Sequence, residues 1–161
     1  MTNILYTIAA MIDAFNSPIL ATGLLTAGTG LIFLASRGHA VALLLSSLLA
    51  LGMSYMLKIL FAVPRLDSAL VPVTGYRFPS QHALIASTFF SSLCFSAFCL
   101  VDSPYIKILI AALSLITIVV IAWSRVFLHA HLPIDVIVGS ILGVSISLVI
   151  HFMLLRKCYA M

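Results

Sequence analysis

The chain has 161 residues, of which 63% are hydrophobic and only 7% are charged. A soluble domain usually carries about 25% charged residues, so this composition argues against a soluble domain and predicts that lipid covers most of the surface. The net charge is +4, but the Lys and Arg residues are scattered singly between apolar runs, which argues against a nucleic-acid partner. We expect residues 1–161 to form a single membrane-embedded domain.

The first stretch, residues 1–16, is shorter than a membrane span and has a helical pattern. Its apolar residues recur at helical spacing: Ile4, Leu5, Ile8, Met11, Ile12 and Phe15. Asp13 and Asn16 interrupt the pattern. We interpret this stretch as a short amphipathic helix that lies in the membrane interface. The alternative is a sixth, partly buried helix of the bundle.

Five apolar runs follow, each close to the length of about 20 residues that a spanning helix needs. They are residues 17–36, 40–63, 82–102, 104–124 and 133–155. Their connections are short except at 64–81, which we expect to be the active-site loop. The predicted fold is therefore an all-α integral membrane bundle of five transmembrane helices plus the N-terminal helix.

Three local signals refine this prediction. Pro64 should end or kink the second run. Gly139 and Gly143 form a GxxxG pattern in the last run, which favours close approach of a neighbouring helix. Cys94 and Cys99 lie within one apolar run, where cysteine behaves as a small hydrophobic residue, and the odd total of three predicts no disulfide framework.

Polar residues next to the runs gather on one side of the predicted membrane. They are Lys58 and Arg65 at the end of the second run, His82 at the start of the third, Arg125 at the end of the fourth, and His131 and Asp135 at the start of the fifth. Because the chain crosses back and forth, these ends and starts fall on the same face. Ionisable residues at membrane spans are costly, so their clustering indicates a functional site.

Three sequence clusters contain these residues. The first is Lys-Ile-Leu-Phe-Ala-Val-Pro-Arg at 58–65, the second is Phe-Pro-Ser-Gln-His at 78–82, and the third runs from Ser124-Arg125 through His131 to Asp135. Together they resemble the signature of the type-2 phosphatidic acid phosphatase family, which shares its site with vanadium haloperoxidases. That signature is Lys, six residues, Arg-Pro; then Pro-Ser-Gly-His; then Ser-Arg, five residues, His, three residues, Asp. The chain departs from it at Gln81, where the family has Gly, and at Leu66, where it has Pro.

The residue types suit phosphate chemistry independently of this resemblance. A phosphate ester is anionic and needs fixed cations, which Lys58, Arg65 and Arg125 can supply. If the helix continued past Pro64, Lys58 and Arg65 would share one face. Ser80 and the backbone amides near Gln81 precede a helix start, which is an anion-binding position.

We predict that His131 is the nucleophile. Asp135 lies four residues later, so around a helix start its carboxylate can accept one ring N–H of His131 and fix the tautomer. His82 can protonate the departing lipid oxygen and later activate water. The resemblance implies the same assignment, residue by residue. No metal and no other cofactor is predicted, because the cations supply the charge stabilisation.

The long connection carries further polar residues that the family signature does not include. Arg77 is a fourth cation on the site face, and Tyr76 precedes it. We interpret both as possible headgroup contacts, with Arg77 able to grip the second phosphate of a diphosphate or a sugar or glycerol group. His39, His129 and His151 have no partner spacing that indicates a role in the site.

The predicted function is metal-independent hydrolysis of a membrane lipid phosphate or diphosphate through a phosphohistidine. The resemblance implies undecaprenyl diphosphate, phosphatidylglycerol phosphate, phosphatidic acid or lipid A phosphates as substrates. Alternatives are transfer of the phosphate to another lipid, or a non-catalytic phosphate-binding membrane protein. We expect the bilayer and the lipid as partners, with no obligate protein partner.

The placement in the cell follows from the remaining cations. Arg37, Lys107, Arg156 and Lys157 lie on the face opposite the site. Positive residues in short loops favour the cytoplasm, and these four have no motif around them. We therefore expect a bacterial inner-membrane protein with its active site facing the periplasm.

Overall fold

The structure is a computed structural model that describes residues 2–15 and 18–156. Within these two ranges the chain forms six helices and no strand. The helices are α1 (Thr2–Phe15), α2 (Pro18–Ala35), α3 (Arg37–Phe61), α4 (Gln81–Leu100), α5 (Pro104–Phe127) and α6 (Pro133–Leu154). Met1, Asn16, Ser17 and Lys157, which bear on the predicted helix limits and surface charge, lie outside the described residues.

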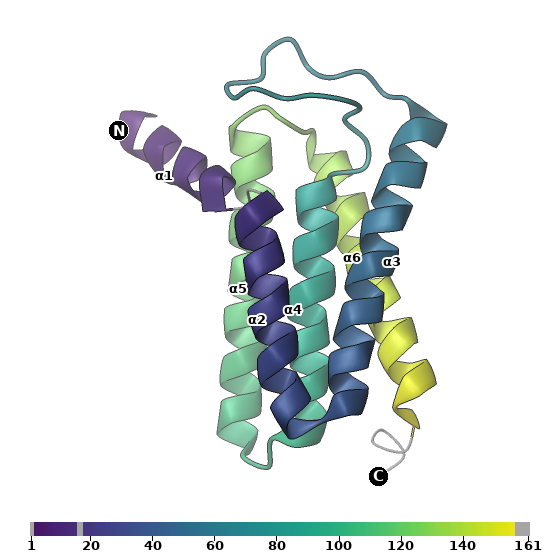
Figure 1. The fold of residues 1–161 in the computed structure, drawn as a ribbon. Coiled ribbons are helices and arrows are strands. Elements are labelled where there is room, and N and C mark those ends of the chain that lie inside the picture. Colours follow the sequence, from purple (N-terminus) through teal and green to yellow (C-terminus); the bar gives the residue numbers. More distant parts are fainter. Residues whose placement is uncertain (1, 16–17, 157–161) are drawn as a thin grey trace.

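The all-α membrane architecture predicted from the sequence is confirmed in its main features. Helices α3, α4, α5 and α6 are each long and apolar enough to cross a membrane, judged by length and composition. In Figure 1, α2 to α6 run along a common bundle direction, and the segment between α3 and α4 arches over one end. Helix α2 coincides with the first predicted run, and its crossing of the membrane stays a prediction.

Helix α1 leaves the bundle at an angle, near the end where the long segment lies (Figure 1). It packs against α5, and its Ala9 is completely buried, whereas Ile4 is 66% exposed. The Tyr6 hydroxyl donates a hydrogen bond to the carbonyl of Leu70 in the long segment, with a distance of 3.4 Å. These contacts are compatible with a helix in the membrane interface, which remains a prediction.

Helix α3 ends at Phe61, before Pro64, as the sequence predicted. Ala62 adopts a left-handed conformation with φ 44°, and its N–H donates to the carbonyl of Lys58. The helix does not continue past Pro64, because the residue before a proline avoids the helical region. The interpretation that Lys58 and Arg65 share one helix face is therefore wrong, and Arg65 reaches the site from an irregular segment.

Close packing of α4 on α6 depends on the two glycines of the GxxxG pattern. A Cβ added at Gly139 would lie 2.7 Å from the carbonyl oxygen of Ser80. One added at Gly143 would collide with the carbonyl oxygen of Leu84 and lie 2.9 Å from the backbone nitrogen of Thr88. The predicted close approach is confirmed, and it brings the first turn of α4 beside the first turns of α6.

A buried row of polar contacts continues along the same interface toward the other end of the bundle. The Thr88 hydroxyl donates to the carbonyl of Gly143 at 3.3 Å, and the hydroxyls of Ser92 and Ser147 are 2.8 Å apart. The ring Nε2 of His151 lies 3.4 Å from the Ser96 hydroxyl. Such hydrogen bonds help helices to associate in lipid.

The cysteines differ from their predicted role in one respect. Cys94 is a free thiol, whereas Cys99 near the end of α4 is disulfide-bonded. The disulfide of Cys99 could not be predicted from the number or the spacing of the cysteines.

We expect Gly143→Ala to lower the free energy of unfolding by about 2 kcal/mol, because the added methyl meets backbone atoms that cannot rotate away. Gly139→Ala should act in the same direction. Gly52→Ala is the matched control, since nothing lies within 4 Å of a Cβ at that position. Unfolding in mixed detergent micelles measures the difference, and equal stability of the Gly143 and Gly52 variants would contradict the packing argument.

Candidate active site

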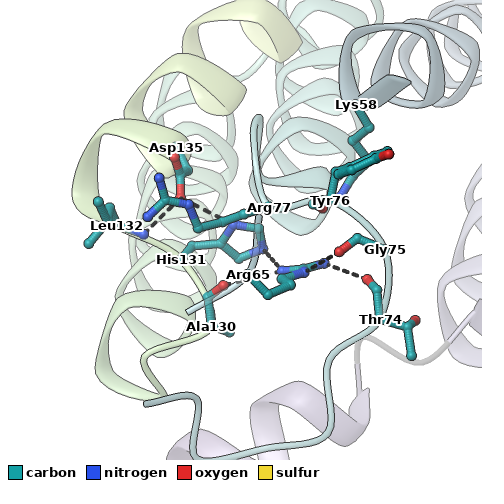
Figure 2. Close-up of polar contacts among 10 residues, drawn as sticks. All are labelled: Lys58, Arg65, Thr74, Gly75, Tyr76, Arg77, Ala130, His131, Leu132 and Asp135. Carbon is teal, nitrogen blue, oxygen red and sulfur yellow. Dashed lines mark hydrogen bonds and ion pairs between the residues drawn. The ribbon is translucent and has the colours of Figure 1, made fainter. Parts of the chain in front are cut away.

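Several of the predicted site residues come together at the end of the bundle that the long segment covers. Figure 2 shows Lys58 from the last turn of α3 and Arg65 and Arg77 from the long segment. It also shows His131 from the connection between α5 and α6, and Asp135 from the first turn of α6. Residues far apart in the sequence thus contribute to one cluster of polar contacts.

The turn between α5 and α6 positions His131. The N–H of Ala130 donates to the carbonyl of Arg125 and the N–H of His129 to that of Val126, with distances of 3.1 and 3.0 Å. His129 is left-handed, with φ 53°, so the turn is a Schellman motif. The N–H of His131 also donates to the Arg125 carbonyl, at 3.2 Å. The role of His129, which sequence reasoning missed, is to end the helix.

The first turn of α6 positions Asp135. Pro133 begins the helix, and Asp135 Oδ2 accepts a hydrogen bond from the N–H of Leu132 at 2.8 Å. The Asp135 carbonyl accepts one from the N–H of Ser80, at 3.0 Å. The second and third sequence clusters are therefore joined directly through the backbone.

The contacts of His131 define its tautomer. Its Nε2 lies 3.3 Å from Nη1 of Arg65, and its Nδ1 lies 3.6 Å from Oδ2 of Asp135. A guanidinium can only donate hydrogen bonds, so Nε2 must present its lone pair and Nδ1 must carry the proton. The carboxylate thus faces the ring N–H as predicted, although 3.6 Å is too long for the predicted hydrogen bond.

Arg65 is held by backbone carbonyls that could not be predicted from sequence patterns. Its Nη2 donates to Thr74, its Nε to Gly75 and its Nη1 to Ala130, over distances of 3.0, 3.3 and 3.2 Å (Figure 2). Gly75 has φ 67°, a conformation that favours glycine. The turn around Gly75 therefore aims two carbonyls at the guanidinium and fixes it beside His131.

Lys58 and the residues before α4 are tied together. The Lys58 ammonium donates to the carbonyl of Tyr76 at 2.7 Å. The ring of Phe78 meets the ring of Phe61 edge to face, with centroids 5.2 Å apart. The side chain of Tyr76 is 43% exposed, so its backbone carbonyl, rather than its hydroxyl, takes part in the cluster.

Arg77 makes a contact that the sequence did not predict. Its Nε lies 3.2 Å from Oδ2 of Asp135, the same oxygen that faces His131 Nδ1 (Figure 2). The two side chains are 13% and 1% exposed, so the ion pair is largely shielded from water.

Burial and positive charge keep the His131 imidazole neutral. Burial, as the larger cause, lowers the pKa of His131 from 6.5 to about 2, and nearby positive charges add to the effect. In decreasing order they belong to Arg65, Arg125, Lys58 and His82. The three predicted phosphate-binding cations and the predicted acid His82 therefore all act on the same ring, which is unprotonated at physiological pH.

Ser80 and Gln81 stand at the start of α4. Ser80 is completely buried, and its hydroxyl has no hydrogen-bond partner among the residues the structure describes. The first backbone bond into the helix runs from Leu84 N–H to the Ser80 carbonyl, so the preceding N–H groups have no acceptor within α4. Arg125, which closes α5, is 3% exposed. The described ranges hold no group of three or more His, Cys, Asp or Glu side chains able to bind a metal ion.

Comparison with known proteins places this chain in a family. The sequence profile of the PAP2 superfamily matches residues 39–157, which include all three clusters. The chain belongs to the PAP2 superfamily.

Individual relatives of this PAP2 chain agree with the assignment. It is 33% identical over 124 residues to an undecaprenyl-diphosphatase of Sulfolobus acidocaldarius, a match that covers 73% of the chain and 56% of that relative. The chain thus spans little more than half the length of this curated protein.

Two solved structures share the fold. A transmembrane PAP2-type phosphatidylglycerolphosphate phosphatase from Bacillus subtilis superposes with a TM-score of 0.82 at 19% identity, covering 92% of this chain and 76% of that one. LpxE from Aquifex aeolicus gives 0.70 at 22% identity, with 91% and 85% covered. At these identities the likeness establishes the fold alone.

We expect His129→Val to lower the free energy of unfolding by about 1–2 kcal/mol, because a β-branched residue is strained at positive φ. His129→Gly should be at least as stable as the native chain. Thermal unfolding in detergent compares the two variants, and a valine variant as stable as the glycine variant would show that the turn is not held in this conformation.

Proposed function

We propose that this PAP2 protein is a lipid phosphatase that hydrolyses a membrane lipid phosphate or diphosphate with His131 as nucleophile. The observation that carries the proposal is the state of the His131 ring. Its Nε2 lone pair faces the cationic cluster, while its Nδ1–H faces a buried carboxylate. A neutral imidazole oriented in this way is a competent nucleophile for an anion that the cations bind.

The cations would bind the phosphate group. Arg65 lies 3.3 Å from Nε2 of His131, so a phosphate on Arg65 is beside the attacking nitrogen. Lys58 and Arg125 add two further positive charges near the ring. The buried Ser80 hydroxyl and the N–H groups that begin α4 at Gln81 are additional donors for phosphate oxygens.

In the first step, Nε2 of His131 forms a bond to phosphorus while the bond from phosphorus to the lipid oxygen breaks. His82 gives its proton to that departing oxygen. In the second step, water attacks the phosphohistidine, His82 accepts the water proton, and the nitrogen–phosphorus bond breaks to release inorganic phosphate. Asp135 stabilises the positive charge that the ring carries between the two steps.

Charge stabilisation by side chains makes a metal unnecessary in this mechanism. Phosphoryl transfer spreads negative charge over the equatorial oxygens. The positive charges of Lys58, Arg65 and Arg125, which all act on the His131 ring, would stabilise that charge as metal ions do in other phosphatases. The proposed enzyme therefore needs neither a metal nor another cofactor.

The natural lipid is proposed from two kinds of support. The relative of 33% identity is an undecaprenyl-diphosphatase, which supports a polyprenyl diphosphate. The B. subtilis neighbour is a phosphatidylglycerolphosphate phosphatase, which makes glycerophospholipid phosphates the second class to test. Phosphatidic acid and lipid A phosphates complete the panel.

We place the site end of the bundle outside the cytoplasm, in the periplasm of a bacterial inner membrane. The exposed cations Arg37 and Arg156 lie at the other end, which supports this orientation. The disulfide of Cys99 is at that end too and counts against this orientation, since cytosolic disulfides are rare outside hyperthermophiles.

Labelling with an impermeant maleimide in a cysteine-free background tests the orientation. The reagent should label Ser68→Cys in intact cells and Arg37→Cys only after lysis. The reverse pattern would invert the orientation.

We expect purified protein to release phosphate from at least one lipid of the panel, with EDTA present throughout. His131→Asn should reduce turnover by at least about 10³-fold, because the proposed nucleophile is lost. His129→Gly, two residues away in the same turn, is the matched control and should keep its turnover. A fully active His131→Asn variant would refute the nucleophile, and loss of activity on chelation would refute the metal-free mechanism.

A further inference from the structure

Arg77 has a fixed backbone and a side chain that reaches across the site. Its N–H donates to the carbonyl of Val63 at 2.9 Å, and the adjacent Tyr76 carbonyl holds the Lys58 ammonium. The neighbouring Phe78 packs against Phe61. These contacts hold the main chain between the end of α3 and the start of α4, while the guanidinium lies at Asp135 beside His131 (Figure 2).

The two oxygens of the Asp135 carboxylate differ in the contacts they make. Its Oδ2 accepts from the Leu132 N–H at 2.8 Å, contacts Arg77 Nε at 3.2 Å and faces His131 Nδ1 at 3.6 Å. Its Oδ1 and the His131 Nδ1 are both buried and make no hydrogen bond to described residues. Arg77 therefore shares the oxygen on which the His131 N–H would form its hydrogen bond.

The charges of the cluster suggest where Arg77 goes when a substrate binds. The other three cations, Lys58, Arg65 and Arg125, together with Asp135, leave two net positive charges, which match the roughly two negative charges of a phosphate monoester. Arg77 adds one more positive charge, and a diphosphate ester carries about one more negative charge. The two guanidiniums flank the same pair of residues, because Arg65 Nη1 lies 3.3 Å from His131 Nε2 and Arg77 Nε lies 3.2 Å from the Asp135 oxygen that faces His131 Nδ1.

We propose that Arg77 selects diphosphates. Its guanidinium leaves Asp135 and binds the phosphate group that is not attacked. This departure lets the Nδ1–H of His131 donate a hydrogen bond to Oδ2 of Asp135. This inference rests on the phosphatase function proposed above. A monophosphate lacks the second anionic group, so less binding free energy is available to draw Arg77 away from Asp135. The same motion that binds the diphosphate completes the pairing of the nucleophile with its carboxylate.

The test compares farnesyl diphosphate with farnesyl monophosphate, which share one tail and differ in the number of phosphates. Arg77→Ala should lower kcat/KM for the diphosphate by about 10- to 100-fold, mainly through KM, because a charge-assisted contact to the substrate is lost. The kcat for the monophosphate should rise, because Arg77 no longer occupies the Asp135 oxygen to which His131 Nδ1–H would bond. Arg77→Lys should restore most of the diphosphate preference.

Arg37→Ala is the matched control, since it removes an exposed arginine at the other end of the bundle. A purely structural role of Arg77 predicts instead an equal loss of kcat on both substrates, not rescued by Arg77→Lys, and this result would overturn the inference while leaving the phosphatase function intact. If the native protein turns over neither substrate nor any other lipid of the panel, the proposed function itself fails. Thermal unfolding of each variant confirms that the comparison is made between folded proteins.

Discussion

The contact of α4 with α6 at Gly139 and Gly143 is the constraint on which the site depends. The helix backbones approach so closely there that a single methyl group at either glycine would meet main-chain atoms. This approach allows the N–H of Ser80 to reach the carbonyl of Asp135, which joins the start of α4, the proposed anion-binding position, to the start of α6. A wider spacing would separate the proposed phosphate donors near Ser80 from His131, even with every proposed catalytic side chain present.

The second requirement is an imidazole that stays neutral among cations. Burial and nearby positive charges both lower the pKa of His131, so the ring remains a free base with its Nε2 lone pair beside Arg65. In the proposed mechanism, bound phosphate would lower the free-energy cost of positive charge on the ring, because its negative charge favours the imidazolium that forms as Nε2 attacks. The proposed site is therefore suited to stabilise charge that would develop during the proposed reaction rather than charge in the resting ring.

Much of this arrangement could be predicted from the sequence, because successive membrane-spanning helices begin and end on alternating faces of the membrane. The positions of Lys58, Arg125 and His131 at span ends were enough to place them together. Sequence could not give the path of the chain after Pro64, where the helix stops and the carbonyls of Thr74 and Gly75 hold the arginine instead. Nor could it reveal the long-range contact of Arg77 with Asp135 or the disulfide of Cys99, since neither follows from local spacing.

The most direct test of the account is to identify the atom that carries phosphate during turnover. A His82→Ala variant, given a labelled aryl phosphate whose leaving group needs no protonation, should accumulate a phosphoenzyme because the water step lacks its base. The account predicts a base-stable, acid-labile label on the peptide that contains His131, with none in the His131→Asn variant. A label on a serine or aspartate, or steady turnover by an enzyme that never carries covalent phosphate, would contradict it.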